Sequence, residues 1–157
     1  MTTQLNPTRR QVMMASTGLA ASMLMRPALA QTNEIDELAA AVSAYAAGKN
    51  ITPGKVKLAI AELVDNGNVV PITVTVDSPM TAANHVKAIA VFNEKNPQRD
   101  VVKFTLGERY GKADVSTRIR LATTQKLVAV AQMSDGTFWS HTVDVIVTLA
   151  ACIEGET

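Results

Sequence analysis

KLVAVAQMSDGTFWSHTVDVIVTL (residues 126–149) contains two apolar runs separated by a short polar segment. The first run ends at Met133 and the second begins at Phe138. The Ser-Asp-Gly-Thr segment between them has the composition of a turn. Both runs are rich in valine, a β-branched residue that favours strands. This stretch therefore predicts two strands joined by a turn, and it sets the expectation for the rest of the chain.

More strands are predicted on the N-terminal side of this stretch. Val56, Leu58 and Ile60 alternate with other residues, which is the period of a strand with one buried face. The segment 65–68 (Asp-Asn-Gly-Asn) predicts a hairpin turn in which Gly67 adopts a positive φ. Pro71 favours an edge or a bulge over a central ladder. In full, strands are predicted over 56–60, 69–76, 86–92, 101–106, 115–122, 126–133 and 138–149.

One helix is expected before the strands. Asn33 can cap it, acidic residues fill its first turn and Gly48 ends it, so the helix is predicted over 33–49. Seven or so strands on about 100 residues predict a mainly β fold, an immunoglobulin-like antiparallel β-sandwich preceded by one N-terminal helix. Since the chain has one cysteine, hydrophobic packing must hold the sheets together. The rings expected in the core are Phe92, Phe104, Phe138 and Trp139.

The first 30 residues have the features of an export signal. Arg9 and Arg10 form a twin-arginine pair in a leader without acidic residues, and the apolar stretch 12–25 is too short to span a bilayer. It leads to Ala-Leu-Ala, the pattern that a signal peptidase cuts, which places cleavage between Ala30 and Gln31. We therefore expect a twin-arginine signal peptide over 1–30, a mature domain over 31–157 and a periplasmic location.

The mature chain is close to neutral. The whole chain has 15 basic and 14 acidic residues, and three of the basic ones lie in the predicted signal. Twelve basic against 14 acidic residues leave a net charge of −2. This balance gives no electrostatic case for binding nucleic acid or an anionic membrane.

Few side chains suggest catalysis or metal binding. His85 and His141 are 56 positions apart with no ligand partner at metal-binding spacing, so they are interpreted as a strand-start residue and an outward-facing strand residue. Arg118 and Arg120, two apart in a predicted strand, share a face, where they either bind a partner's carboxylates or form a solvated edge. No phosphate loop, nucleophile elbow or Cys-x-x-Cys motif is present. The sequence thus does not indicate an enzyme.

Cys152 is the only cysteine. In the oxidising periplasm an unpaired thiol suggests an intermolecular bond or a sulfur with a chemical task, although a lone cysteine is more often a small buried hydrophobe. The last strand is predicted to end at Leu149, which puts Cys152 three residues beyond the sheet on a mobile terminus.

Several stretches together resemble the sulfur-carrier subunit Y of the bacterial Sox thiosulfate-oxidising system. They are DNGNVVPITVTVDSPMT (65–81), HVKAIAVFNEKNP (85–97), STRIRLATTQKLVAVAQMSDGTFW (116–139) and VTLAAC (147–152). The resemblance implies an immunoglobulin-like sandwich, a heterodimer with the Z subunit, and Cys152 as the attachment point of a covalent sulfur adduct. It implies no cofactor on this chain. Haem, manganese and molybdenum belong to the partner enzymes: a coupling cytochrome, a sulfate-releasing hydrolase and a sulfane dehydrogenase.

The predicted C-terminal arm (150–157) departs from the family pattern. The family surrounds its cysteine with glycines, whereas here Ala150 and Ala151 precede Cys152 and Ile-Glu-Gly-Glu-Thr follows. Three interpretations remain at this point. The chain is a covalent sulfur carrier, a non-carrier binding or assembly protein whose cysteine is vestigial or bonded to another chain, or an enzyme with Cys152 as nucleophile but no visible base.

Overall fold

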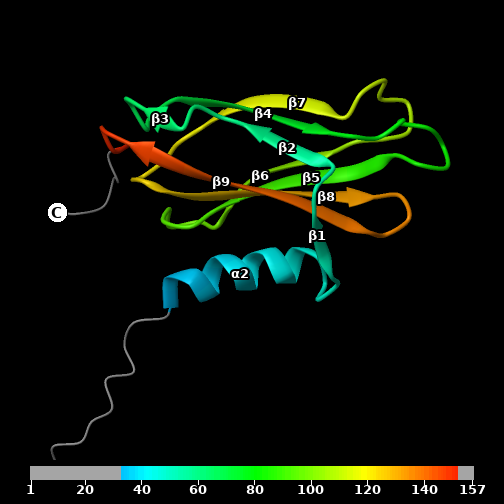
Figure 1. Cartoon of the computed structure of the whole chain (residues 1–157), viewed down its shortest axis with the longest axis horizontal. Helices are drawn as coiled ribbons and strands as arrows, with labels where there is room; N and C mark the ends of the chain where they lie inside the picture. Colours follow the sequence, from blue (N-terminus) through cyan, green and yellow to red (C-terminus); the bar gives the residue numbers. More distant parts are fainter. Residues whose placement is uncertain (1–32, 152–157) are drawn as a thin grey trace, which may run out of the picture. The chain divides into compact units, whose positions relative to one another are not determined.

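The computed structural model describes residues 33–151 (Figure 1). One helix precedes the strands and keeps the label α2 of the figure. The elements are α2 (Asn33–Tyr45), β1 (Ile51–Pro53), β2 (Val56–Ala59), β3 (Leu63–Val64), β4 (Val70–Val76), β5 (Val86–Asn93), β6 (Asp100–Thr105), β7 (Asp114–Ile119), β8 (Gln125–Met133) and β9 (Phe138–Val147).

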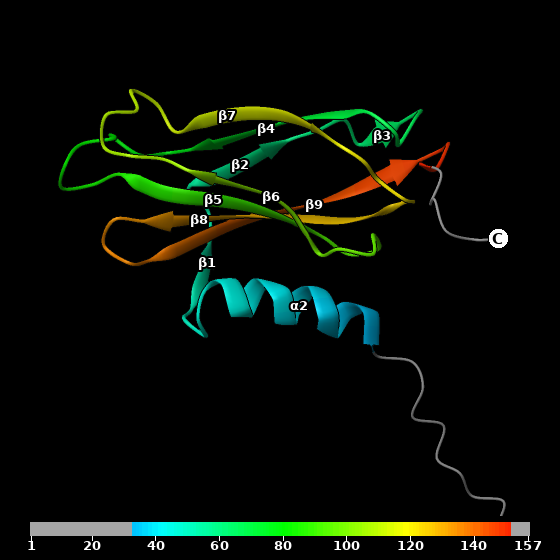
Figure 2. The ribbon, with the colours of Figure 1, turned by 180° about the vertical axis from the view of Figure 1, so that it is seen from behind.

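The strands form two sheets packed face to face. The larger has the order β1-β9-β8-β5-β6, with β3 also pairing β9, and the smaller has the order β2-β4-β7. All pairs are antiparallel except the short parallel pairs of β1 and β3 with β9. Figures 1 and 2 show the small sheet on one side of the large sheet and α2 on the other. The mainly β, immunoglobulin-like sandwich with one preceding helix is confirmed. β1 and β3 were missed because two or three residues are too few to show a period.

The central strands of the large sheet are buried on both faces. Almost every residue of β5 and β8 is buried, because the small sheet covers one face and α2 covers the other. This explains why these strands are continuous apolar runs instead of alternating ones. Of the four rings expected in the core, Phe92 and Phe138 are buried on the helix side, and Phe104 and Trp139 are partly buried against the core between the sheets.

The helix is shorter than the predicted 33–49 and ends at Tyr45. The Gly48 N–H donates to the Ser43 carbonyl (3.0 Å) and the Ala47 N–H donates to the Ala44 carbonyl (3.1 Å), the two bonds of a Schellman motif. Ala47 (φ 51°) therefore already turns into the left-handed region, one residue before Gly48 (φ 73°). The Tyr45 ring packs edge-on against Phe92 at 5.6 Å between centroids, and burial raises the pKa of Tyr45.

The predicted hairpin turn at 65–68 is wrong in two respects. β2 and β4 do pair in antiparallel fashion, but the ten residues between them leave the small sheet, form β3 beside β9 and return. Gly67 also does not have a positive φ, which among described glycines occurs at positions 48, 54 and 136. Pro71 lies in β4, the middle strand of the small sheet, but at a position that is locally an edge, as expected. β2 pairs only residues 73–76 of β4, so Pro71 has a strand neighbour, β7, on one side alone.

Within residues 33–151, no helix has the length and apolar character needed to cross a membrane.

Candidate functional site

The end of the sandwich at which β9 stops is the region that leads to Cys152 (Figure 1). β9 stops at Val147, two residues before the predicted strand end. The chain nevertheless stays bonded to the domain. The Thr148 N–H donates to the Val64 carbonyl (3.0 Å), and the Thr148 hydroxyl donates to the Asp65 carbonyl (3.2 Å). The segment after β9 is therefore held against β3 and the loop that follows it.

Two further residues hold this segment as far as Ala151. The Gly67 N–H donates to the Leu149 carbonyl (2.8 Å), and the Ala151 N–H donates to the Leu121 carbonyl (3.1 Å). The Leu121 N–H in turn donates to the Gly67 carbonyl (2.8 Å). We call Gly67, Leu121, Leu149 and Ala151 the C-terminal clamp. It joins three chain segments that are distant in sequence by backbone hydrogen bonds alone.

The clamp requires glycine at position 67 because of close backbone approach. A Cβ on Gly67 would lie 2.3 Å from the Leu121 carbonyl oxygen and 3.0 Å from the Ala151 nitrogen. Both are backbone atoms, which cannot rotate away as a side chain does. Gly67 itself is visible in the sequence, where it suggests a turn conformation, whereas the structure explains it by close packing.

Asn96 supports the loop that carries Leu121 of the clamp. Its Oδ1 accepts from the Ala122 N–H (3.0 Å) and from Gln125 Nε2 (2.8 Å), and its Nδ2 donates to the Arg120 carbonyl (2.9 Å). Asn96 thus bonds the residues on both sides of Leu121. Gln125 is 4% exposed, and its Oε1 accepts the Lys95 N–H. Asn96 therefore fixes the loop that carries Leu121 of the clamp.

The clamp changes the expectation of a mobile terminus from Leu149 onward. Ala151 is 7% exposed and hydrogen-bonded, so the anchored chain extends two residues further than predicted. Cys152 is the next residue and lies outside the described residues. Consecutive Cα atoms are about 3.8 Å apart and a side chain adds about 3 Å, so the Cys152 sulfur lies within about 7 Å of the Ala151 Cα.

The remaining predicted site residues belong to the export signal. Arg9 and Arg10, and the cleavage pair Ala30 and Gln31, also lie outside the described residues.

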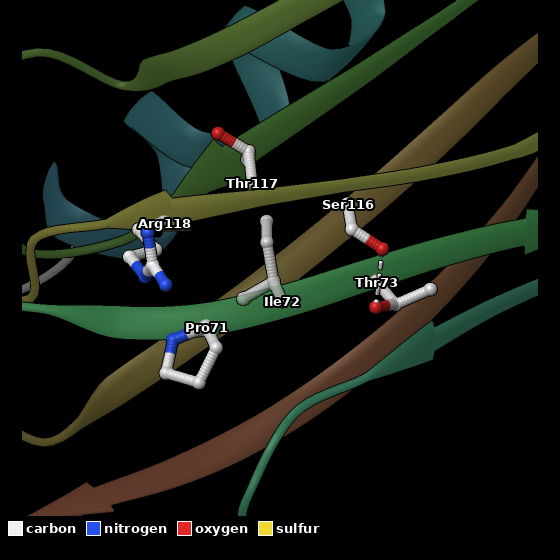
Figure 3. Close-up of a pocket in the computed structure, with 6 residues that line it drawn as sticks. All are labelled: Pro71, Ile72, Thr73, Ser116, Thr117 and Arg118. Atoms are coloured by element: carbon white, nitrogen blue, oxygen red, sulfur yellow. Dashed lines mark hydrogen bonds between the residues drawn. The ribbon is translucent and has the colours of Figure 1, made fainter.

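Arg118 and Arg120 do not share a site. Arg118 lines a shallow depression on the outer face of the small sheet, beside a hydrogen bond between the Thr73 and Ser116 hydroxyls (2.8 Å; Figure 3). Arg120 follows the end of β7 and borders a different hollow, near Asn96 and Asp100. β7 ends at Ile119, but exposure still alternates across this point, since Ile119 is buried and Arg118 and Arg120 are both exposed.

The two histidines have structural roles. His85 directly precedes β5, as predicted, and its Nδ1 lies 3.1 Å from the Thr81 carbonyl. His141 does not face outward. It is partly buried, and its Nδ1 accepts the Leu58 N–H (3.1 Å), which ties β9 of one sheet to β2 of the other. Between residues 33 and 151, no three His, Cys, Asp or Glu side chains gather as a metal site would require.

Replacing His141 with phenylalanine is expected to cost about 1–2 kcal/mol of unfolding free energy, because the Leu58 N–H then has no acceptor. His141→Asn retains an acceptor at similar reach and is expected to lose less. Urea unfolding of the two variants measures the difference. If His141→Phe and His141→Asn were both as stable as the wild type, the His141 hydrogen bond would contribute nothing measurable.

The fold and the site define a β-sandwich in which Ala151, the last described residue, is hydrogen-bonded to the domain and directly precedes the only cysteine of the chain. A family model described as "Sulfur oxidation protein SoxY" matches residues 42–152, so the match ends on Cys152. The chain therefore belongs to the SoxY family, and this membership supports a sulfur-carrier role. Comparison with curated protein sequences gives no match.

Solved structures agree with this assignment. The sulfur carrier protein SoxY from Chlorobium limicola f thiosulfatophilum is 29% identical with a TM-score of 0.61, and the alignment covers 73% of this chain and 99% of that one. A superoxide reductase (neelaredoxin) from Ignicoccus hospitalis is 19% identical with a TM-score of 0.53, covering 60% and 80% of the two chains. A superoxide reductase from Nanoarchaeum equitans is 13% identical with a TM-score of 0.52, covering 61% and 100%. The reductases share the fold alone.

Proposed function

We propose that the chain is a periplasmic sulfur carrier that holds thiosulfate-derived or related sulfur intermediates covalently on Cys152 while partner enzymes act on them. The observation that supports this most is that the family match ends on Cys152, one residue beyond the C-terminal clamp. The carrier is exported by the twin-arginine route, its signal peptide is cleaved between Ala30 and Gln31, and it pairs with a Z-type subunit.

Loading is an oxidation and needs an electron acceptor. The Cys152 thiolate forms a bond to the outer sulfur of thiosulfate, the thiol proton is released, and two electrons pass to a haem-containing coupling cytochrome. A hydrolase then adds water across the bond between the outer sulfur and the sulfonate. This step releases sulfate and one proton and leaves a persulfide on Cys152. A sulfane dehydrogenase then oxidises the sulfane sulfur that remains to a sulfonate, with oxygen taken from water, protons released and the electrons passed to an external electron acceptor. No step requires a catalytic group on the carrier.

The anchoring of the chain directly before Cys152 suits this role. Thiosulfate is small and diffusible, and a covalent link keeps each intermediate from leaving between enzymes. The clamp limits the directions from which the sulfur can be presented, so less orientational freedom is lost when the arm enters an active site.

The test is intact-mass spectrometry of the protein isolated from the periplasm, with a Cys152→Ala variant as the control. A carrier is expected to show added masses of sulfane sulfur or a thiosulfonate that reductant removes and that Cys152→Ala lacks. A stable disulfide to another protein at this position, without any such adducts, would instead indicate the assembly protein. Turnover of thiosulfate by the purified chain alone would indicate the enzyme.

The composition of the arm leads to a prediction about loading. Ile153 is β-branched and therefore stiff beside the sulfur. Glu154 adds negative charge near the thiol, which repels the thiosulfate anion. The Ile153→Gly/Glu154→Gly double variant is expected to be loaded faster by the coupling cytochrome, by about threefold, since screening keeps the charge effect modest. Stopped-flow loading at two salt concentrations measures it. A rate equal to that of the wild type would show that the enzyme tolerates the extension.

A further inference from the structure

Asn66 and Gly67 form an Asn-Gly pair in the loop between β3 and β4. In such a pair the backbone nitrogen of the glycine can attack the side-chain carbon of the asparagine, because glycine has no Cβ to obstruct the approach. Asn66 is exposed, whereas Gly67 is buried. The loop therefore places a reactive side chain in solvent directly beside a backbone nitrogen that the C-terminal clamp uses.

The Asn66 side chain folds back over the Gly67 peptide. Its Oδ1 accepts from the Asn68 N–H (2.9 Å) and from Asn68 Nδ2 (3.0 Å). The first of these bonds closes a ring that contains Gly67, so it keeps the side-chain amide of Asn66 beside the Gly67 peptide. Two donors on one oxygen also polarise the side-chain carbon towards a nucleophile. The electrophile of the reaction is thus already in place.

The nucleophile, the Gly67 nitrogen, is held by the clamp. Its N–H donates to the Leu149 carbonyl (2.8 Å). The chain on the other side of Asn66 is held as well, since the Asp65 carbonyl accepts from the Thr148 hydroxyl (3.2 Å). Attack on the Asn66 side chain requires the Gly67 nitrogen to lose its proton and its peptide to rotate. Both changes break the hydrogen bond to Leu149, so the closed clamp prevents the reaction.

We propose that Asn66 is a modification site whose conversion to an isoaspartyl residue is blocked by the closed clamp and begins when the clamp opens. The Gly67 nitrogen bonds to the side-chain carbon of Asn66, the bond from that carbon to Nδ2 breaks, and Nδ2 leaves as ammonia with the proton of the Gly67 nitrogen. Water then opens the resulting imide ring at one of its two carbonyl carbons. Opening at the backbone carbon gives the isoaspartyl product, and opening at the side-chain carbon gives an ordinary aspartyl residue. The only co-reactant is water.

The isoaspartyl product does not rebuild the clamp. Its main chain runs through the Asn66 side-chain carbon, which inserts one extra carbon before Gly67. The clamp has no space for such a shift, since a Cβ on Gly67 would already lie 2.3 Å from the Leu121 carbonyl oxygen. The aspartyl product keeps the original main chain and an oxygen for the Asn68 N–H, so it retains the clamp. Conversion to the isoaspartyl form therefore releases the anchored end of the chain at Ala151.

The test follows the products at position 66 in the full mature chain during incubation at neutral pH. Peptide mapping by mass spectrometry detects the exchange of ammonia for water, and protein isoaspartyl methyltransferase labels the isoaspartyl form but not the aspartyl form. A synthetic peptide of residues 63–70 gives the rate without the clamp. Asn68 is the control within the same loop, because the β-branched Val69 that follows it obstructs the attack.

Conversion in the wild type is expected to be at least about thirtyfold slower than in the peptide, because the clamp must open first. Asn96→Ala removes the support of the loop that carries Leu121 and is expected to speed conversion about tenfold. If Asn96→Ala does not fold, Ala151→Pro removes the N–H that donates to the Leu121 carbonyl and is expected to speed conversion about fivefold. His141→Phe lowers the stability of the sandwich without removing a clamp bond, and its rate is expected to stay within about twofold of the wild type.

Hydrogen exchange of the Ala151 amide shows what the modification does to the clamp. In the isoaspartyl fraction of incubated wild type, this amide is expected to exchange at least about tenfold faster than in the fresh protein. Asn66→Asp reproduces the aspartyl product, and its Ala151 exchange is expected to stay within about twofold of the fresh wild type.

Conversion of the wild type at the rate of the peptide would overturn the protection by the clamp. An equal rise in His141→Phe, or an unchanged rate in the folded clamp variants, would overturn it too. Equal conversion of Asn68 would show that exposure, and not the Asn-Gly pair, selects the site. Slow exchange of Ala151 in the isoaspartyl fraction would overturn the release of the anchored end. These results do not depend on sulfur loading of Cys152, so the proposed carrier function stands or fails separately on its adduct masses.

Discussion

Gly67→Ala is expected to have the largest effect on the domain, with a loss of about 3 kcal/mol in unfolding free energy. The added Cβ would lie 2.3 Å from the Leu121 carbonyl oxygen and 3.0 Å from the Ala151 nitrogen. Neither backbone atom can move without breaking a hydrogen bond of the C-terminal clamp. The variant must therefore lose one or more of these bonds, in addition to the strain.

Hydrogen exchange distinguishes this mechanism from a general loss of stability. In Gly67→Ala the amide protons of Leu121 and Ala151 are expected to exchange faster than those of the central strand β8 by more than the global change explains. Gly107→Ala and Gly111→Ala are matched controls, since a Cβ at either position meets no heavy atom within 4 Å and neither glycine has a positive φ. Their stability is expected to be unchanged or slightly raised. Unaltered stability and unaltered protection of Ala151 in Gly67→Ala would refute the clamp.

Asn96→Ala is expected to cost about 2–4 kcal/mol, because one side chain satisfies three groups. The substitution leaves the Ala122 N–H, the Arg120 carbonyl and the Nε2 of the buried Gln125 without their partner. Both backbone groups flank Leu121, so the loop that accepts the Ala151 N–H loses its support. We therefore expect faster exchange of the Ala151 amide as well as lower stability.

Two further variants make this prediction specific. Asn96→Asp keeps an acceptor for the Ala122 N–H but has no donor for the Arg120 carbonyl, so its loss is expected to fall between those of the wild type and Asn96→Ala. Gln98→Ala changes an exposed residue two positions further along and is expected to change stability by less than about 0.5 kcal/mol. Unfolding in urea gives all three values. A loss below about 1 kcal/mol for Asn96→Ala would mean that water replaces its hydrogen bonds.

The end of the chain that carries Cys152 shows what sequence patterns can predict and what they cannot. The position of Cys152 beyond the last strand and the resemblance to a sulfur-carrier family pointed to the same end of the chain, and the family match reaches this residue. The anchoring of Ala151 was not foreseen, because the three segments of the clamp meet through backbone atoms. Backbone hydrogen bonds between distant segments leave no mark on residue type, except where they exclude a side chain, as at Gly67.

The prediction for His141 was wrong for a related reason. Alternation along a strand predicts which residues share a face of one sheet, but not what covers that face. His141 contacts β2 of the other sheet, so it does not face outward as expected.

The sequence by itself determined the class of this protein: the sandwich of short strands, the buried runs of β5 and β8, the leading helix and the family. The strands and the helix follow from side-chain period and β-branching, which act over a few neighbouring residues. The family follows from the stretches that resemble it and from the family match over residues 42–152. Only the tertiary structure decided that α2 covers the large sheet, that a two-residue strand pairs with β9, and that Gly67 and Leu121 hold Ala151. Those features depend on contacts between residues far apart in the chain, where close packing, and no local preference, selects the arrangement.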